Sequence, residues 1–400
     1  MPSEPLHIAF AALYDPRDPR RGSGTCFFIG RELERQGHRV DYIGPIDYGD
    51  RLPLATRVLK RLARQSGRRY RTFQDVLVAR RIGRKIESAL GDSSPDLLLT
   101  NDLSIAAYTR CRCPVVLYTS MVFPRRLEEM KHPWLTGHFG PNVLSCRWVN
   151  RKGLARADLW CFPSDWGVDL ALDYGLAGGS DRAMRIEFGD NLFDPPSADI
   201  AAGRSFRRIL ERGALRVLFV GNRDWGLKGG DVALEAVREL RRRGVAAELD
   251  VVGSQPPRTP AEEWIRIHGV IDKLDQSERL IELYATCDLL LVPTRAEGFG
   301  IVFVEAAGFG MPSLSFDSGT GVNSAIHHGE TGLLLPLDSA PNDFADAIES
   351  FYKDPDTYDR LSRGARRFYQ DTANWRRAIE RLIDAARTRL LERSGPESPR

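Results

Sequence analysis

Short apolar segments alternate with segments of helix length along the whole sequence. In a chain of this kind, parallel strands are buried on both faces by helices, so each strand reads as a continuous apolar run. In the first half, the runs expected to form strands are Leu6–Leu13, Val40–Ile43, Asp96–Thr100, Val115–Tyr118 and Asp158–Phe162. The alternation predicts the α/β fold class.

The same pattern restarts in the second half, after a stretch rich in Pro, Gly, Asn and Asp. There the expected strands are Leu215–Val220, Glu248–Val252, Trp264–His268, Asp288–Val292, Ser313–Ser315 and Leu333–Leu335. A chain of 400 residues also suits two domains better than one. We therefore expect a domain over 1–190, a linker over 191–205, a second domain over 206–374, and a closing helix with a frayed tail over 375–400, packing back toward the first domain.

Composition excludes several classes of protein. Apolar residues make up 42% and the net charge is only +3, which is typical of a soluble globular chain. No apolar run approaches the roughly 20 residues that cross a bilayer, and Met1–Leu13 lacks the basic start of a signal peptide. The six cysteines show neither zinc-site nor disulfide-framework spacing. We expect reduced thiols, no metal site and a cytoplasmic location.

The segment Pro293–Pro312 carries the clearest chemical signal. It follows an expected strand, and its loop holds Gly298 and Gly300 before a helix that begins near Ile301. The first turn of a helix leaves backbone N–H groups unpaired and has a partial positive charge. Because glycines let the backbone approach closely, the segment predicts a site for a phosphate or another anion.

Three charged residues accompany such loops. Glu297 lies in the loop and Glu305 in the following helix, where both could accept hydrogen bonds from hydroxyls. Lys228 precedes Gly229 and Gly230 in a second strand, glycine loop and helix, where an ammonium could reach a phosphate. Taken alone, each of these side chains would be interpreted as a solvated surface charge, and it is the combination of motifs that favours a binding site.

Together these segments resemble the signature of the retaining glycosyltransferases of family 4, which have the GT-B fold of two Rossmann-like, doubly wound domains facing across a cleft. The resemblance covers most of residues 150–340 and is thinner before them. It implies that Glu297 lies against the donor sugar, that Glu305 binds the nucleotide ribose and that Lys228 binds phosphate. It also implies a donor loop made of Gly298, Phe299, Gly300 and Ile301.

Other positions match that family less closely. The family places an arginine directly after the glycine that closes the strand before Lys228, whereas here Asn222 intervenes and Arg223 follows. Arg223 joins Glu297 and Lys228 as a predicted catalytic residue. Gly319 and Gly321 resemble a further donor loop, and Gly22-Ser23-Gly24-Thr25 resembles the family's glycine loop on the acceptor side of the cleft, with Gly22, Gly24 and Thr25 as its site residues.

The resemblance implies a transferase that moves a sugar from a UDP- or GDP-linked donor to an acceptor hydroxyl, with no cofactor and no required metal. Glycolipid, polysaccharide and glycoconjugate biosynthesis are all compatible with it, and the sequence identifies neither the sugar nor the acceptor. The alternative is a non-catalytic GT-B subunit that binds a nucleotide sugar or serves as a scaffold. An epimerase or a phosphorylase would share the architecture.

Positive charge is concentrated in one stretch. Eleven Lys or Arg residues and one acid, Asp75, lie between Arg57 and Lys85. Leu54, Val58 and Leu62 recur there at four-residue spacing, as in a basic amphipathic helix. Residues 54–85 are therefore candidates for contact with an anionic membrane, peripherally at its inner face. An exposed basic face with no ligand fits equally well, and no nucleic-acid-binding motif accompanies it.

Overall fold

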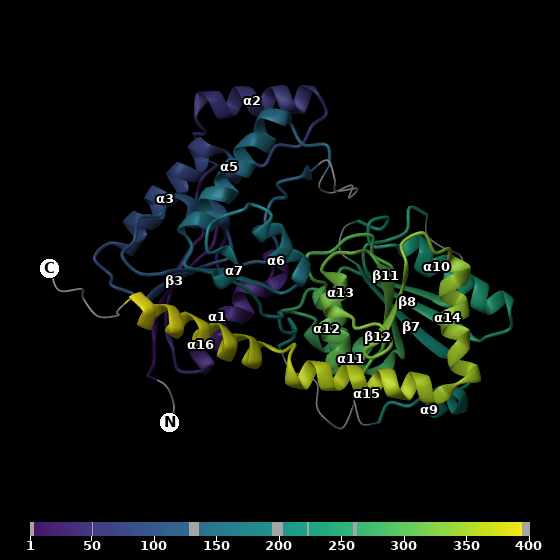
Figure 1. The fold of residues 1–400 in the computed structure, drawn as a ribbon. Helices are drawn as coiled ribbons and strands as arrows, with labels where there is room; N and C mark the ends of the chain where they lie inside the picture. Colours follow the sequence, from purple (N-terminus) through teal and green to yellow (C-terminus); the bar gives the residue numbers. More distant parts are fainter. Residues whose placement is uncertain are drawn as a thin grey trace. The chain divides into compact units, whose positions relative to one another are not determined.

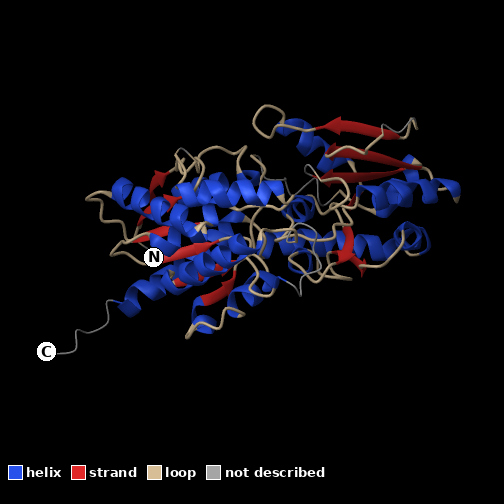
Figure 2. Ribbon diagram, turned by 90° about the horizontal axis from the view of Figure 1, so that it is seen from above, coloured by secondary structure: helices blue, strands red, loops and turns tan. Residues whose placement is uncertain are grey.

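A computed structural model describes residues 4–49, 51–127, 136–193, 203–221, 224–258 and 262–393. The chain forms two compact units, one of Met1–Ile186 with Ile379–Arg400 and the other of Glu187–Ala378 (Figure 1). Residues 194–202 of the predicted linker lie outside the described part of the chain. In each unit the strands lie among helices (Figure 2).

The N-terminal unit contains a parallel sheet of six strands in the order β2-β1-β3-β4-β5-β6. Its strands are β1 (His7–Ala11), β2 (Arg39–Ile43), β3 (Leu97–Thr100), β4 (Val115–Tyr118), β5 (Leu159–Phe162) and β6 (Ala183–Arg185). Its helices are α1 (Thr25–Arg35), α2 (Leu54–Gln65), α3 (Val76–Leu90), α4 (Leu103–Tyr108), α5 (Gly140–Arg156), α6 (Asp165–Leu172) and α7 (Gly179–Arg182), with short 3₁₀ turns at Gly22–Gly24 and Thr72–Gln74.

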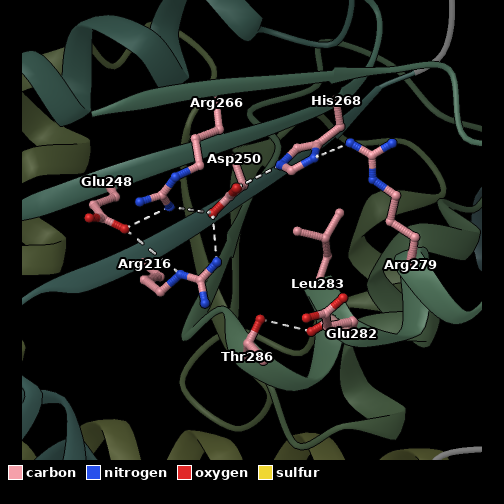
Figure 3. Close-up of a pocket in the computed structure, with 9 residues that line it drawn as sticks. All are labelled: Arg216, Glu248, Asp250, Arg266, His268, Arg279, Glu282, Leu283 and Thr286. Atoms are coloured by element: carbon pink, nitrogen blue, oxygen red, sulfur yellow. Dashed lines mark hydrogen bonds and ion pairs between the residues drawn. The ribbon is translucent and has the colours of Figure 1, made fainter. Parts of the chain in front are cut away.

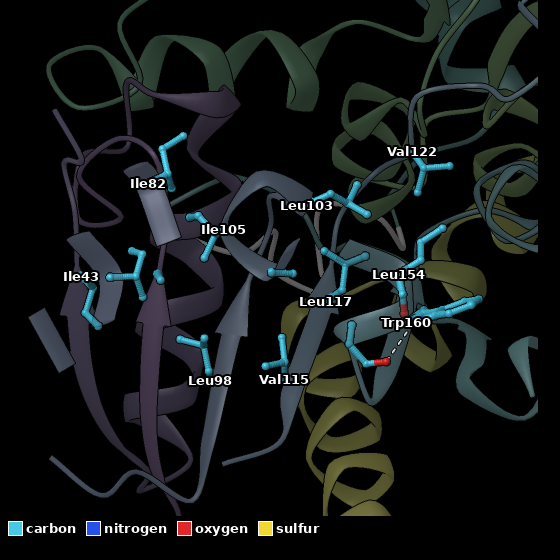
Figure 4. Close-up of a cluster of buried hydrophobic side chains, with 14 of the residues drawn as sticks. Ile43, Ile82, Leu98, Leu103, Ile105, Val115, Leu117, Val122, Leu154 and Trp160 are labelled. Carbon is cyan, nitrogen blue, oxygen red and sulfur yellow. Dashed lines mark hydrogen bonds between the residues drawn. The ribbon is translucent and has the colours of Figure 1, made fainter. Parts of the chain in front are cut away.

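The core of this unit lies between the sheet and the helices that cover it. Every residue of β3, β4 and β5 is buried, as expected for parallel strands covered on both faces. Ile82 of α3 and Leu103 of α4 lie in the same cluster as Leu117 of β4 (Figure 4). Burial of Trp160 leaves no polar group unpaired, because its indole N–H donates to the Leu154 carbonyl at 2.9 Å.

The closing helix α16 (Trp375–Arg393) begins where the sequence predicts it. From Ile379 onward it belongs to the N-terminal unit. Its apolar residues Leu382 and Ile383 lie beside Ile8 of β1 and Leu97 of β3. The helix therefore completes the cover of the first sheet.

The C-terminal unit holds a second parallel sheet of six strands, in the order β12-β11-β10-β7-β8-β9. Its strands are β7 (Leu215–Gly221), β8 (Ala247–Gly253), β9 (Ile265–Gly269), β10 (Leu289–Leu291), β11 (Ser313–Asp317) and β12 (Gly332–Pro336). Its helices are α9 (Phe206–Arg212), α10 (Gly230–Arg242), α11 (Ser277–Thr286), α12 (Ile301–Gly308), α13 (Val322–Ala325), α14 (Pro341–Lys353) and α15 (Pro355–Asp371).

The predicted fold class is confirmed, since both sheets are parallel and flanked by helices. Eleven of the twelve strands coincide with an expected apolar run, and β6 was not predicted. This strand has three half-buried residues at the edge of its sheet, so it lacks the apolar run that marks the others. Among the helices that the structure describes, none combines the length and apolar character needed to cross a bilayer.

Candidate functional site

The candidate site begins at the carboxyl ends of two neighbouring strands, β7 and β10. Because β7 and β10 are neighbours in the sheet, the loops that follow them lie side by side, although β8 and β9 separate the two strands in the sequence. The amide of Arg295 donates to the carbonyl of Leu227 at 2.9 Å, and the Thr294 hydroxyl donates to the same oxygen at 3.3 Å. Hydrogen bonds therefore hold the two loops directly against each other.

Glycines permit this close approach. Gly229 has a φ of +72°, and a methyl group in place of its hydrogen would lie 2.0 Å from the carbonyl oxygen of Pro293. A methyl group on Gly230 would lie 2.4 Å from the ring of Trp225. Only glycine combines the left-handed conformation of Gly229 with so little space, so Gly229 lets this loop lie against the loop that follows β10, while Gly230 makes room for Trp225 within its own loop.

Lys228 and Glu297 meet where the two loops meet. The Lys228 ammonium donates to Oε1 of Glu297 in an ion pair. The side chains are 10% and 19% exposed respectively. Burial lowers the pKa of Lys228 to about 8, and the nearby carboxylate of Asp224 opposes that shift. Arg223, which the sequence predicts beside them, lies outside the described residues.

A third loop, which follows β11, contacts the loop that carries Glu297. The Glu297 amide donates to the Thr320 hydroxyl at 3.2 Å, and the Gly321 amide donates to the Glu297 carbonyl at 3.0 Å. A methyl group on Gly321 would lie 2.1 Å from the carbonyl oxygen of Gly298. Gly321 therefore keeps this loop in backbone contact with the loop that carries Glu297, while Gly319 forms a turn with a φ of +60°.

The loop that carries Glu297 ends at the N-terminus of α12. Gly300 caps this helix with a φ of +98°, and Ile301 is its first residue, as the sequence predicts. The Phe299 side chain is buried and packs edge to face on Phe188, with their ring centres 5.8 Å apart. At the predicted donor position Phe299, the part available to a ligand is therefore the backbone.

The structure gives Glu305 partners different from those of Glu297. Its side chain is 1% exposed, and its two oxygens accept hydrogen bonds from the Lys273 ammonium at 2.6 Å and the Tyr284 hydroxyl at 2.8 Å. Burial, followed by the charge of Glu305, raises the pKa of Tyr284. The sequence analysis did not identify Lys273 or Tyr284, because neither belongs to a glycine loop or a recognisable motif.

The predicted acceptor-side loop lies in the N-terminal unit, between β1 and α1. Gly22 and Gly24 have φ values of +54° and +87°, and Thr25 begins α1. A methyl group on Gly22 would lie 2.1 Å from the Tyr14 hydroxyl, which also receives a hydrogen bond from the Asn101 amide at 3.1 Å. Packing within this unit therefore accounts for the glycine at position 22.

A separate pocket of about 390 Å³ lies beside β7, β8, β9 and α11 (Figure 3). Asp250 at its base is fully buried and pairs with His268 at 2.7 Å and Arg216 at 3.4 Å. Glu248 pairs with Arg266 at 2.7 Å. Lys228 and Glu297 are not among its lining residues, and most of the charged side chains that line it are paired with one another, so we interpret it as a structural network.

Within the described residues, no group of His, Cys, Asp and Glu side chains is arranged to hold a metal ion.

Residues 205–368 match the family model of the glycosyl transferases group 1. The D-inositol 3-phosphate glycosyltransferase of Nocardia farcinica is 32% identical over 223 residues, which are 50% of this chain and 48% of that protein. The alpha-D-kanosaminyltransferase of Streptomyces kanamyceticus is 32% identical over 154 residues, which are 37% of this chain and 39% of that protein. The matched region thus spans about half or less of these relatives.

Solved structures match nearly the whole chain. Sucrose-phosphate synthase from Thermosynechococcus elongatus superposes with a TM-score of 0.67 and 18% identity, covering 98% of this chain and 100% of that one. Anabaena HepE in complex with UDP and glucose gives a TM-score of 0.60 and 16% identity, with coverage of 98% and 100%. The chain has the two-domain α/β fold of GT-B glycosyltransferase structures, and its C-terminal unit carries the region that matches glycosyl transferases group 1.

Proposed function

We propose that this protein is a retaining glycosyltransferase of family 4 that transfers a sugar from a UDP- or GDP-linked donor to an acceptor hydroxyl. The observation that carries the proposal is the buried pair of Lys228 and Glu297 at the adjoining ends of β7 and β10, close to the N-terminus of α12. In open α/β sheets, ligands bind outside the carboxyl ends of the strands. The match of residues 205–368 and the names of the relatives support sugar transfer as the reaction.

The pair suits a donor that carries a diphosphate next to a sugar. In the absence of donor, the Glu297 carboxylate is the partner of the Lys228 ammonium. A bound diphosphate would take over the ammonium, and the N-terminus of α12 would supply backbone N–H groups to the same negative charge. Glu297 would then be released to accept hydrogen bonds from hydroxyls of the sugar.

Catalysis in this scheme is electrostatic. As the bond between sugar and phosphate breaks, negative charge grows on the leaving diphosphate, and fixed positive groups stabilise the transition state more than the ground state. Lys228 and the helix N-terminus would provide that stabilisation without a required metal, with Arg223 as a further cation. In a retaining reaction the acceptor attacks from the face of the leaving group, whose phosphate takes the proton.

Glu305 would bind the ribose of the nucleotide. Each of its carboxylate oxygens accepts one hydrogen bond from the protein, and a carboxylate has about four acceptor positions. Lys273 and Tyr284 fix its orientation, so the remaining lone pairs are held in place for ribose hydroxyls.

The direct test is slow hydrolysis of UDP-glucose and GDP-mannose without acceptor. A parallel reaction with methanol gives a methyl glycoside, whose anomer is read by NMR because a glycoside does not mutarotate as the free sugar does. We expect one donor to be hydrolysed, and its methyl glycoside to retain the configuration of the donor. Lys228→Ala and Glu297→Gln should each lower the rate by about a hundredfold or more, while Lys353→Ala, which removes an exposed lysine of α14, should leave it unchanged. Binding of a donor without any turnover would instead identify a non-catalytic subunit, and equal rates in all variants would refute the assignment.

We also propose that the protein associates peripherally with the inner face of a membrane through α2. Leu54, Val58 and Leu62 are 68%, 49% and 46% exposed, so this apolar stripe is not part of the core. Arg57 and Lys60 are exposed on the same helix, and each basic residue near anionic lipid contributes about 1 kcal/mol. Val58→Asp should reduce cosedimentation with phosphatidylglycerol vesicles, whereas equal pelleting of the wild-type protein with neutral vesicles would contradict an electrostatic role.

A further inference from the structure

Two half-buried cysteines lie in the turn between α4 and β4. Cys111 and Cys113 are separated only by the exposed residue Arg112. Four further cysteines are buried, at positions 26, 146, 161 and 287. Burial raises the pKa of each of these four thiols, and a cysteine reacts as an accessible thiolate. Cys111 and Cys113 are therefore the thiols that a reagent in solution can reach in a reactive form.

A guanidinium group contacts the sulfur of Cys111. Arg156, the last residue of α5, places Nη2 3.2 Å from Sγ of Cys111 and 3.0 Å from the carbonyl oxygen of the same residue. Its Nη1 lies 3.4 Å from the Asp158 carboxylate, which also accepts the Val115 amide at the start of β4 at 2.8 Å. Arg156 is thus held in place by several partners, and its charge favours the thiolate of Cys111 over the thiol.

The second thiol stabilises the same negative charge. A hydrogen bond from Cys113 and the charge of Arg156 lower the pKa of Cys111 to about 7, against the opposing effects of burial and of the Asp158 carboxylate. The hydrogen bond to Cys111, followed by burial, raises the pKa of Cys113. Near pH 7 a large fraction of Cys111 is therefore thiolate, while Cys113 keeps its proton.

The turn also brings the two cysteines within reach of each other. Two Cα–Cα steps of about 3.8 Å separate them, and disulfides span Cα separations of about 4.4–6.8 Å, so a bend in the chain suffices. The chain bends at Arg112 and Cys113, and Sγ of Cys111 lies 3.4 Å from the Cys113 carbonyl oxygen. The start of the turn is fixed to α3, where the Glu87 carboxylate accepts the Arg110 amide at 2.7 Å. The Cys111 sulfur thus faces the residue that carries the second thiol.

We propose that Cys111 and Cys113 form a reversible disulfide when the protein meets a peroxide, with Cys111 as the attacking sulfur. The Cys111 thiolate attacks hydrogen peroxide, an S–O bond forms as the O–O bond breaks, and hydroxide leaves; the sulfur is oxidised to a sulfenic acid and the peroxide is reduced. Cys113 then attacks that sulfur and loses its proton as the S–S bond forms, and the oxygen leaves as water. In total, two thiols and one peroxide give one disulfide and two waters.

The first test counts free thiols in the full-length protein after treatment with hydrogen peroxide, by N-ethylmaleimide labelling and peptide mass spectrometry. In the wild type, peroxide should remove the thiols of Cys111 and Cys113 together, and dithiothreitol should restore both. In Cys113→Ser, Cys111 should stop at a sulfenic acid that dimedone traps, because the resolving thiol is missing. In Cys111→Ser, the thiol of Cys113 should survive the same dose of peroxide.

The second test measures how fast iodoacetamide alkylates Cys111 as pH is varied. The midpoint of the wild-type profile should lie at about pH 7. Arg156→Gln should move it upward, toward about pH 8.5 of an ordinary thiol, and Arg156→Lys, which keeps the charge, should give a midpoint between the two. Arg112→Gln is the matched control, because it removes a charge from the same turn, and it should move the midpoint less. Thermal denaturation checks that each variant is folded.

The proposal would be overturned if peroxide left both thiols of the wild type free, or oxidised the buried cysteines as fast. A wild-type alkylation midpoint at or above about pH 8.5 would also overturn it, and this readout needs no variant to fold. Equal midpoints in Arg156→Gln and Arg112→Gln would refute the part assigned to Arg156. None of these measurements uses a nucleotide, so failure of the donor assignment would leave this site standing.

Discussion

Nucleotide binding should weaken as pH rises through the pKa of Lys228. Burial lowers that pKa to about 8, from about 10.4 for an exposed lysine. A diphosphate binds the ammonium and not the neutral amine. The protonated fraction falls from about 0.9 at about pH 7 to about 0.1 at about pH 9, so the apparent Kd for the nucleoside diphosphate should rise about tenfold, or about 1.4 kcal/mol.

Deprotonation of Lys228 at high pH has the opposite effect on the stability of the fold from its effect on nucleotide binding. Between about pH 8 and about pH 10.4 the folded chain binds fewer protons at Lys228 than the unfolded chain does. The free energy of unfolding therefore rises with pH across this window, as far as Lys228 determines it. Weaker nucleotide binding above pH 8 then cannot be attributed to loss of the fold through this residue.

Isothermal titration with UDP and GDP between pH 7 and pH 9 would measure the effect, in two buffers of different ionisation enthalpy so that proton uptake is seen directly. Lys228→Arg is the matched control, because a guanidinium stays charged over this range and its binding should be independent of pH. Lys228→Met should bind weakly at every pH. A wild-type profile that coincides with that of Lys228→Arg would show that the titration of Lys228 does not govern binding.

Two further predictions concern Lys273 and Gly229, which hold the side chains and loops of the site in place. Lys273→Met leaves the buried carboxylate of Glu305 without its cation and should lower the free energy of unfolding by about 3 kcal/mol. Adding Glu305→Gln should restore most of this loss, as measured by urea denaturation. Additive losses in the double variant would contradict the pairing of the two side chains. Gly229→Ala places a methyl group against the Pro293 carbonyl at a φ of +72° and should lower both the melting temperature and the affinity for UDP. In the control Gly226→Ala the added methyl group meets open space, so both quantities should change little. Equal melting temperatures in the two variants would refute this account.

Local patterns predicted the two sheets well because a parallel strand buried on both faces must be apolar throughout. β3, β4 and β5 are fully buried and were all expected. The positions of Gly300 at the start of α12 and of Trp375 at the start of α16 were also readable, because helix starts and apolar spacing are properties of neighbouring residues.

Contacts between distant segments were not readable in this way. Lys228 and Glu297 are 69 residues apart, and they meet because β10 lies beside β7 in the sheet. Glu305 is paired with Lys273, whose segment shows no pattern that would reveal it. The sequence by itself determined which segments become strands, glycine loops and helices, since those depend on near neighbours along the chain. Only the tertiary structure decided which charges face one another, because strand order in a sheet is set by packing of the whole unit.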